Sequence, residues 1–214
     1  MKKIVLIGDS IRMGYDKYVR EALSDSALVL YPEENCKFAE YVLRFVHEWK
    51  NNGGWGSDVD AVHWNAGLWD CLELFGDEPL TSLSYYEEAI RRIDKRLRFL
   101  FPNAKLIFAT STPVAEERMR ADFKRHNSTI RLYNETALRA LAGTDTVIND
   151  LYAVCEALPE SAHSDGVHYY TDEGTAAIGG KVIAEFCHAL GIEASEVKLE
   201  NFEPEKYSVG NIGY

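Results

Sequence analysis

The chain has 214 residues, enough for one sizeable hydrophobic core and short for two. Its 34 acidic and 23 basic side chains give a formal charge of -11, which would repel a phosphate backbone and argues against nucleic acid as a partner. Hydrophobic residues make up 46% and charged residues 27%, as is typical of a globular protein.

The N-terminal segment and the cysteines give two further expectations. After Met1 and two lysines comes the apolar run Ile4–Ile7, which is too short for the core of a signal peptide or for a membrane span. We therefore predict a cytoplasmic protein with no membrane partner. The four cysteines are scattered, with no close pair at metal-ligand spacing, so we expect reduced thiols and no metal site.

Five short apolar runs predict strands. They are rich in β-branched or aromatic residues and do not alternate strictly with polar ones, as is typical of strands covered on both faces. In chain order, the runs span Ile4–Ile7, Ala27–Tyr31, Val59–Trp64, Lys105–Thr110 and Thr146–Ile148.

Between these runs, apolar residues recur at spacings of three and four, which predicts amphipathic helices. These stripes extend over Tyr15–Leu23, Phe38–Trp49, Tyr86–Leu100, Ile130–Leu141 and Ile178–Leu190. Strands that alternate with helices imply right-handed crossovers, hence an α/β fold in which a five-stranded parallel sheet lies between two helical layers. We predict a single domain over 1–214, with its core at about 1–191. The extension 192–214 either packs against the core or contacts another subunit.

A serine follows the first predicted strand directly. Gly8, Asp9 and Ser10 lie at the carboxyl end of that strand, where ligands bind in open parallel sheets. At this position Ser10 can present its hydroxyl to a substrate, while its amide near a helix start points toward a bound anion. The alternative is that Ser10 simply caps the first helix. This loop alone does not separate the two readings.

An aspartate and a histidine precede the last predicted helix, for which Thr171 is the expected N-cap. Asp165 and His168 lie three residues apart, so a turn can bring the carboxylate to one ring nitrogen and leave the other facing Ser10. That arrangement is the nucleophile, base and orienter of a catalytic triad. Alternatively, Asp165 is a turn residue and His168 a satisfied, half-buried histidine, or both bind a metal together with His163.

These two segments resemble conserved blocks of the GDSL/SGNH hydrolases. Ile4–Ile11, which ends in Gly-Asp-Ser-Ile, is similar to the first block, and Asp165-Gly-Val-His168 is similar to the last. The resemblance covers roughly residues 1–191 and implies a flavodoxin-like fold, with Ser10, His168 and Asp165 as the catalytic residues. It implies no metal or organic cofactor.

The resemblance also implies an oxyanion hole made by the amide of Ser10, a glycine after the second strand and an asparagine after the third. This chain departs from the pattern at both later positions. Asn35 or Cys36 stands where the glycine is expected, and either backbone amide can still donate. Trp69 stands at the asparagine position, so the side chain of Asn65 replaces it or the third donor is missing.

We predict a serine esterase that removes small acyl groups, with acetyl favoured, from a carbohydrate or a similar polar alcohol. We place Asp9, Gly67 and Trp69 at the substrate. Trp55, Trp64 and Trp69 either stack on a sugar or, as we favour, belong to the core. The alternatives are an acyltransferase with the same triad and a non-catalytic ligand-binding domain. The sequence leaves the oligomeric state open.

Overall fold

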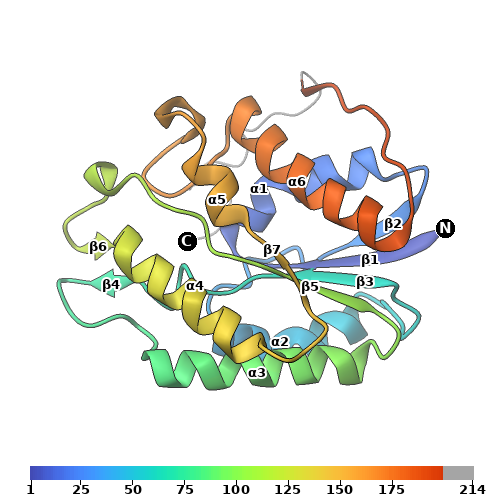
Figure 1. Cartoon of the computed structure of the whole chain (residues 1–214), viewed down its shortest axis with the longest axis horizontal. Coiled ribbons are helices and arrows are strands. Elements are labelled where there is room, and N and C mark those ends of the chain that lie inside the picture. Colours follow the sequence, from blue (N-terminus) through green and yellow to red (C-terminus); the bar gives the residue numbers. More distant parts are fainter. Residues whose placement is uncertain (200–214) are drawn as a thin grey trace.

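The computed structural model describes residues 1–199, which fold into alternating strands and helices (Figure 1). The strands are β1 (Lys2–Ile7), β2 (Ala27–Leu30), β3 (Ala61–Trp64), β4 (Glu73–Leu74), β5 (Lys105–Ala109), β6 (Phe123–Lys124) and β7 (Val147–Asn149). The helices are α1 (Ser10–Ala22), α2 (Ala39–Asn52), α3 (Leu83–Leu100), α4 (Asn127–Leu141), α5 (Leu151–Glu156) and α6 (Asp172–Leu190). Two short 3-10 helices are η1 (Glu116–Arg118) and η2 (Glu160–Ala162).

The main sheet is parallel throughout. Within the described residues it has five strands in the order β2-β1-β3-β5-β7. Val5 of β1 pairs with Leu30 on one side and Val62 on the other, and Val62 pairs in turn with Leu106. The five strands and the parallel sheet predicted from the apolar runs are therefore confirmed.

Helices cover both faces of this sheet. In Figure 1, α1, α5 and α6 lie on one face, and α2, α3 and α4 lie on the other. Ile4 to Ile7 of β1 are fully buried as a consequence, and a fully buried aliphatic side chain contributes about 1.5–3 kcal/mol. This burial explains why the strand sequences are continuously apolar rather than alternating. The predicted three-layer α/β/α architecture is confirmed.

Two features were not predicted. The segments after β3 and β5 form a small antiparallel ladder, in which Glu73 pairs with Lys124 and Leu74 with Phe123. A further short helix, α5, follows β7, with its N-cap Asp150 accepting from the N–H of Ala153. By contrast, the predicted N-cap Thr171 of α6 is confirmed, since its hydroxyl accepts from Gly174 N at 3.0 Å.

The first part of the C-terminal extension packs against the body of the chain. Ser195 donates its N–H to the carbonyl of Ala22 at 2.7 Å, and Ser26 donates to the carbonyl of Glu193 at 2.7 Å. Residues 200–214 lie outside the described residues, so the role predicted for that part stays a prediction. Within residues 1–199, no helix is both long and apolar enough to cross a bilayer.

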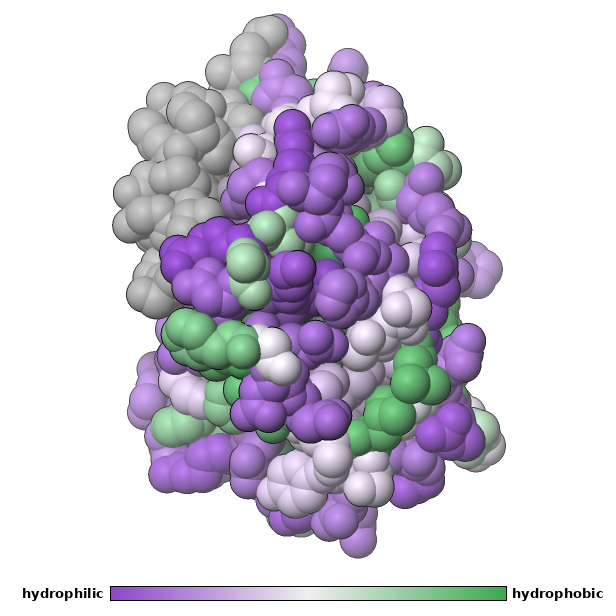
Figure 2. Space-filling model, turned by 90° about the vertical axis from the view of Figure 1, so that its left-hand side faces the viewer, coloured by the Kyte–Doolittle hydropathy of each residue, from purple (hydrophilic) through white to green (hydrophobic). Residues whose placement is uncertain are grey.

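The strand order creates a crevice at one end of the sheet. From β1 the chain crosses first to β2 on one side and then to β3 on the other, so the connections leave the carboxyl ends of β1 and β3 in opposite directions. Figure 2 shows the side of the molecule to which these strand ends point; hydrophilic side chains predominate there and apolar ones form separate patches. Ligand-binding residues are expected on the loops at this end.

Candidate active site

The first of these loops carries Ser10 directly after β1. Asp9 is the N-cap of α1, because its Oδ1 accepts from Ile11 N at 2.9 Å. Ser10 is therefore not the capping residue, and its hydroxyl serves another contact. Its Oγ lies 2.8 Å from Nε2 of His168, although the two residues are 158 positions apart.

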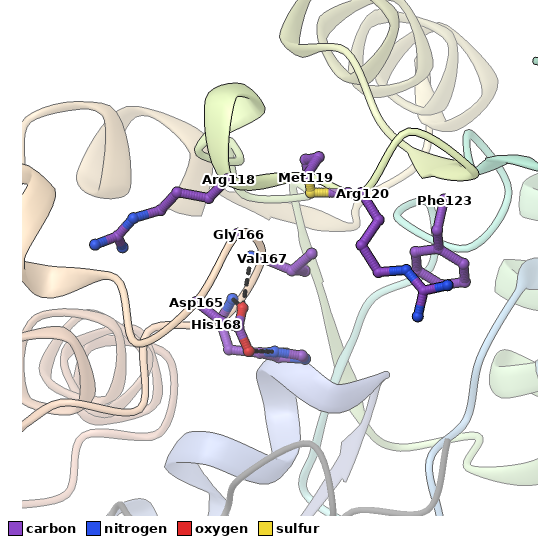
Figure 3. Close-up of a pocket in the computed structure, with 8 residues that line it drawn as sticks. All are labelled: Arg118, Met119, Arg120, Phe123, Asp165, Gly166, Val167 and His168. Atoms are coloured by element: carbon purple, nitrogen blue, oxygen red, sulfur yellow. Dashed lines mark hydrogen bonds and ion pairs between the residues drawn. The ribbon is translucent and has the colours of Figure 1, made fainter.

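The loop before α6 folds into a tight turn that sets the His168 ring. The Ser164 N–H donates to the His168 carbonyl at 2.8 Å, which closes the turn. Asp165 Oδ1 accepts from Val167 N at 2.6 Å and from His168 N at 2.8 Å. Its Oδ2 lies 2.7 Å from His168 Nδ1, as the dashed lines in Figure 3 show. The structure thus places Ser10, His168 and Asp165 in one continuous hydrogen-bonded chain.

The surroundings of Asp165 favour its charged form. Partial burial opposes ionisation, but the hydrogen bond from the His168 ring, its charge and the two backbone N–H groups outweigh that effect. Together they lower the pKa of Asp165 to about 2. The carboxylate is therefore available as an acceptor for a histidine N–H at every pH near neutrality.

Tyr170 contacts both His168 and Ser10, and we did not single it out in the sequence. Its ring stacks on His168, with centroids 4.6 Å apart and planes inclined by 21°. Its hydroxyl donates to the carbonyl oxygen of Ser10 at 2.5 Å. The only signal available was its position two residues after His168.

A pocket of about 290 Å³ opens beside the histidine. Met119, Phe123 and Val167 give it apolar walls, and Asp165 and His168 line it as well. In Figure 3, the segment carrying Arg118, Met119 and Arg120 faces the Gly166–His168 turn, with Phe123 to one side. Its volume lies near the lower end of the range for small-molecule sites.

The loop after β2 is fixed to the nucleophile loop by Arg12 and Cys36. Arg12 is 1% exposed; its Nη1 lies 2.5 Å from Asp16 Oδ2, and its Nη2 donates to the Glu34 carbonyl at 2.6 Å. Cys36 donates its N–H to the carbonyl of Gly8 at 3.2 Å. Of the two backbone donors considered from the sequence, the amide of Cys36 is thus already used, which leaves that of Asn35.

The loop after β3 carries Asn65, whose side chain we expected as an oxyanion donor. This side chain is buried, and its Nδ2 donates to the Ala109 carbonyl at 2.9 Å, so that it joins the ends of β3 and β5. Gly67 has φ +154°, a conformation that favours glycine, and a Cβ at this position would meet the hydroxyl of Ser111. Glycine is therefore required here for packing, and the substrate contact expected of Gly67 stays a prediction.

Asp9 is a buried residue that caps α1. Its side chain is fully buried, and burial raises its pKa, opposed in part by the Ile11 N–H and the charge of Arg125. Asp9 therefore caps α1 beside the nucleophile, and its contact with a substrate stays a prediction. Trp55 and Trp64 are core residues, as we favoured, whereas Trp69 is half-buried.

Arg125 is a further buried group that the sequence did not indicate. It is 1% exposed, and its Nε donates to the carbonyl of Leu68. The guanidinium lies 5.9 Å from the Trp69 ring centre and 5.2 Å from that of Phe123. An arginine in a stretch as polar as Arg120–His126 reads as a solvated surface residue, so no sequence signal could have found it.

No cluster of three or more histidine, cysteine or carboxylate side chains suited to a metal ion occurs among residues 1–199. His163, considered above as a ligand with Asp165 and His168, instead packs its ring against Tyr169 with centroids 4.1 Å apart. The three residues therefore do not form a common metal site.

Known structures share this architecture. A lipase/acylhydrolase from Enterococcus faecalis is 18% identical, with a TM-score of 0.67 over 92% of this chain and 100% of that one. An acetyl xylan esterase, AlAXEase, is 15% identical with a TM-score of 0.66 over 86% and 98%. A GDSL-like lipase from Bacteroides thetaiotaomicron is 18% identical with a TM-score of 0.64 over 88% and 89%.

The chain has the GDSL/SGNH hydrolase fold. The flavodoxin-like fold that the two sequence blocks implied is thereby confirmed. The sequence itself matches no protein-family model and no curated protein. The likeness therefore concerns the fold alone.

Proposed function

We propose that this protein is a serine esterase in which Ser10 is the nucleophile, His168 the general base and Asp165 the orienting carboxylate. The observation that carries the proposal is the unbroken chain from Ser10 Oγ to His168 Nε2 at 2.8 Å and from His168 Nδ1 to Asp165 Oδ2 at 2.7 Å. A serine hydroxyl is a weak nucleophile unless an adjacent base accepts its proton, and this geometry supplies one.

The reaction proceeds through an acyl-enzyme. As Ser10 Oγ bonds to the ester carbonyl carbon, its proton passes to His168 Nε2 and the carbonyl oxygen becomes an oxyanion. His168 then gives that proton to the leaving alcohol as the ester C–O bond breaks. Water attacks the acyl-enzyme by the same steps, which releases the acid and restores Ser10. Asp165 stabilises the imidazolium formed in each half-reaction.

Backbone donors for the oxyanion come from two loops. The N–H of Ser10 lies at the start of α1, where backbone N–H groups have no acceptor within the helix. The amide of Asn35 belongs to the loop that Arg12 and Cys36 fix to the nucleophile loop. Donors of this kind act on charge that develops only in the transition state.

For the substrate we propose a small acyl ester, with acetyl favoured, of a carbohydrate or another polar alcohol. The pocket beside His168 is near the lower end of the ligand-site range, which suits a small substrate. A protein of similar fold is named an acetyl xylan esterase. Half-buried Trp69 can offer a ring face to a sugar at the edge of the site.

The test is hydrolysis of p-nitrophenyl acetate by the wild-type protein and by Ser10→Ala. We expect turnover by the wild type and only the background rate with the folded variant. Hydrolysis that survives in Ser10→Ala would remove the nucleophile from the proposal.

A further inference from the structure

The remaining question at this site is which side chain acts as the third oxyanion donor. The position that the family resemblance assigns to an asparagine holds Trp69, whose ring packs edge-on against Phe123 with centroids 6.5 Å apart. An indole has one N–H and cannot reproduce an amide. Asn65, the alternative from the sequence, already uses an N–H to join β3 to β5 through Ala109.

The side-chain NH₂ group of Asn35 is buried and has no hydrogen-bond partner within residues 1–199. The residue is 4% exposed, and its Nδ2 makes no hydrogen bond there. Its Oδ1 accepts from Lys37 N at 2.9 Å. Because a backbone N–H can only donate, the oxygen must face Lys37 and the free atom must be the NH₂ group. A buried donor without an acceptor is unfavourable, because it has lost its hydrogen bonds to water and gained none in return, so it is rare in folded proteins.

The chain on either side of Asn35 fixes where that amide lies. Before it, the Glu34 carbonyl is held by Arg12, whose Cβ packs against Gly8. After it, the N–H of Cys36 is bonded to the Gly8 carbonyl, two residues before Ser10.

The same segment then reaches the other wall of the crevice. The N–H of Ala39 donates to both carboxylate oxygens of Asp70, at 3.0 and 3.2 Å, and Asp70 directly follows Trp69. Asn35 therefore lies on the segment that links the nucleophile loop to the third-strand loop, at the switch point between β1 and β3. Lys37 within it has a left-handed backbone, with φ +49°, a strained conformation of the kind that clusters at functional sites.

We propose that the Asn35 side-chain amide is the third oxyanion donor, in place of the asparagine expected at position 69. This inference rests on the esterase mechanism proposed above. The unpartnered NH₂ then receives its acceptor when the carbonyl oxygen becomes negative. The hydrogen bond to Lys37 keeps the carboxamide oriented in advance, as preorganised stabilisation requires.

Two substitutions separate the effect of the Asn35 NH₂ donor from that of the hydrogen bond between Asn35 Oδ1 and Lys37 N–H. Asn35→Gly keeps the backbone amide and removes the carboxamide. Asn35→Asp keeps an oxygen for Lys37 N–H and removes the NH₂ group. Both variants should lower kcat for p-nitrophenyl acetate by about 10²–10³-fold. KM should stay within about threefold, because the ground-state ester makes little use of this donor.

Asn127→Gly is the matched control. Like Asn35, Asn127 accepts a backbone N–H with its Oδ1, here from Val114 at 2.9 Å. Unlike that of Asn35, its Nδ2 already has an acceptor, the Val114 carbonyl. This variant should lose thermal stability and keep its kcat. Wild-type kcat in either folded Asn35 variant would overturn the proposal. So would a 10²–10³-fold loss in Asn65→Ala alone, which would assign the donor to Asn65.

A measurement on the wild-type protein decides the question even if neither Asn35 variant folds. A fluorophosphonate leaves a tetrahedral phosphonyl group on Ser10 whose oxygen occupies the oxyanion position. The ¹⁵N-attached side-chain protons of Asn35 should shift downfield when this adduct forms; unchanged resonances would exclude the donor role. If the wild type neither reacts with the probe nor hydrolyses the ester, the esterase proposal itself fails, an outcome distinct from loss of the Asn35 assignment alone.

Discussion

At the scale of single residues, the role of Asp165 depends on one hydrogen bond to His168. Asp165→Asn keeps the oxygen that accepts from Val167 and His168 N–H but offers Nδ1 a donor in place of an acceptor. The imidazole then adopts the wrong tautomer, with its proton on Nε2, and cannot accept the proton of Ser10.

We expect kcat to fall by up to about 10⁴-fold in this variant, measured with p-nitrophenyl acetate. Asp172→Asn, at an exposed position in the first turn of α6, is the control and should match the wild type. A decrease of less than about tenfold in Asp165→Asn would show that Asp165 does not orient the base.

The cysteines give a second prediction at this scale. Burial raises the pKa of Cys36 to about 11 and that of Cys71 and Cys155 to about 12, so these thiols stay protonated near neutral pH. Only Cys187 is partly exposed. Iodoacetamide should therefore label the native protein at Cys187 at most, without loss of esterase activity, as mass mapping and an assay would show. Inactivation that follows labelling of Cys36 would point to a thiol nucleophile.

The residues that the sequence could identify are those with a motif. Ser10, Asp165 and His168 could be recognised because two short sequence blocks, one near each end of the chain, contain them. The sequence could not show that the amide of Asn65 is already bonded to Ala109 or that the amide of Asn35 is not. Such facts depend on which loops meet in space, and no residue spacing contains them.

At the scale of elements, Asp70 connects the loop after β3 to the first turn of α2. Burial raises its pKa to about 7, although the N–H of Ala39 and the hydroxyl of Thr81 favour the charged form. The usual value is 3.8, so between about pH 4 and 7 the chain takes up a proton at Asp70 when it folds. The contribution of this protonated carboxyl to the free energy of unfolding is fully present below that pH window and is lost as the pH rises through it.

Asp70→Asn removes the charge and keeps an oxygen for the Ala39 N–H. At pH 8 the variant should exceed the wild type in free energy of unfolding by up to about 4 kcal/mol, since one pKa unit corresponds to about 1.4 kcal/mol. At pH 4 the difference should vanish. Urea titrations across this range measure it, with the exposed Asp77→Asn as the control. A difference that does not change with pH would contradict the assignment of the titrating group to Asp70.

Element prediction succeeded where the pattern is local and long. The five apolar runs became the main sheet, and the amphipathic stripes became α1, α2, α3, α4 and α6. The ladder between β4 and β6 was missed because each strand has two residues and its partner lies about 50 positions away. Helix α5 spans six residues, too few for a periodic stripe to be recognised.

At the scale of the whole molecule, the parallel sheet brings the catalytic groups together. Every strand of the main sheet ends at the same edge, so the loop after β1 and the turn before α6 meet there. The switch between β1 and β3 opens the crevice, and the loop carrying Asn35 links its two walls. The fold thus supplies the site's position, while loop residues supply its chemistry.

Covalent labelling shows directly whether this assembly activates Ser10. The folded wild-type protein is treated with a fluorophosphonate probe, and the site of addition is mapped by mass spectrometry. We expect one adduct per chain, at Ser10, and almost none in His168→Ala, because that variant lacks the base that activates the hydroxyl. An adduct at another residue, or no adduct on the folded wild type, would rule out Ser10 as the activated nucleophile.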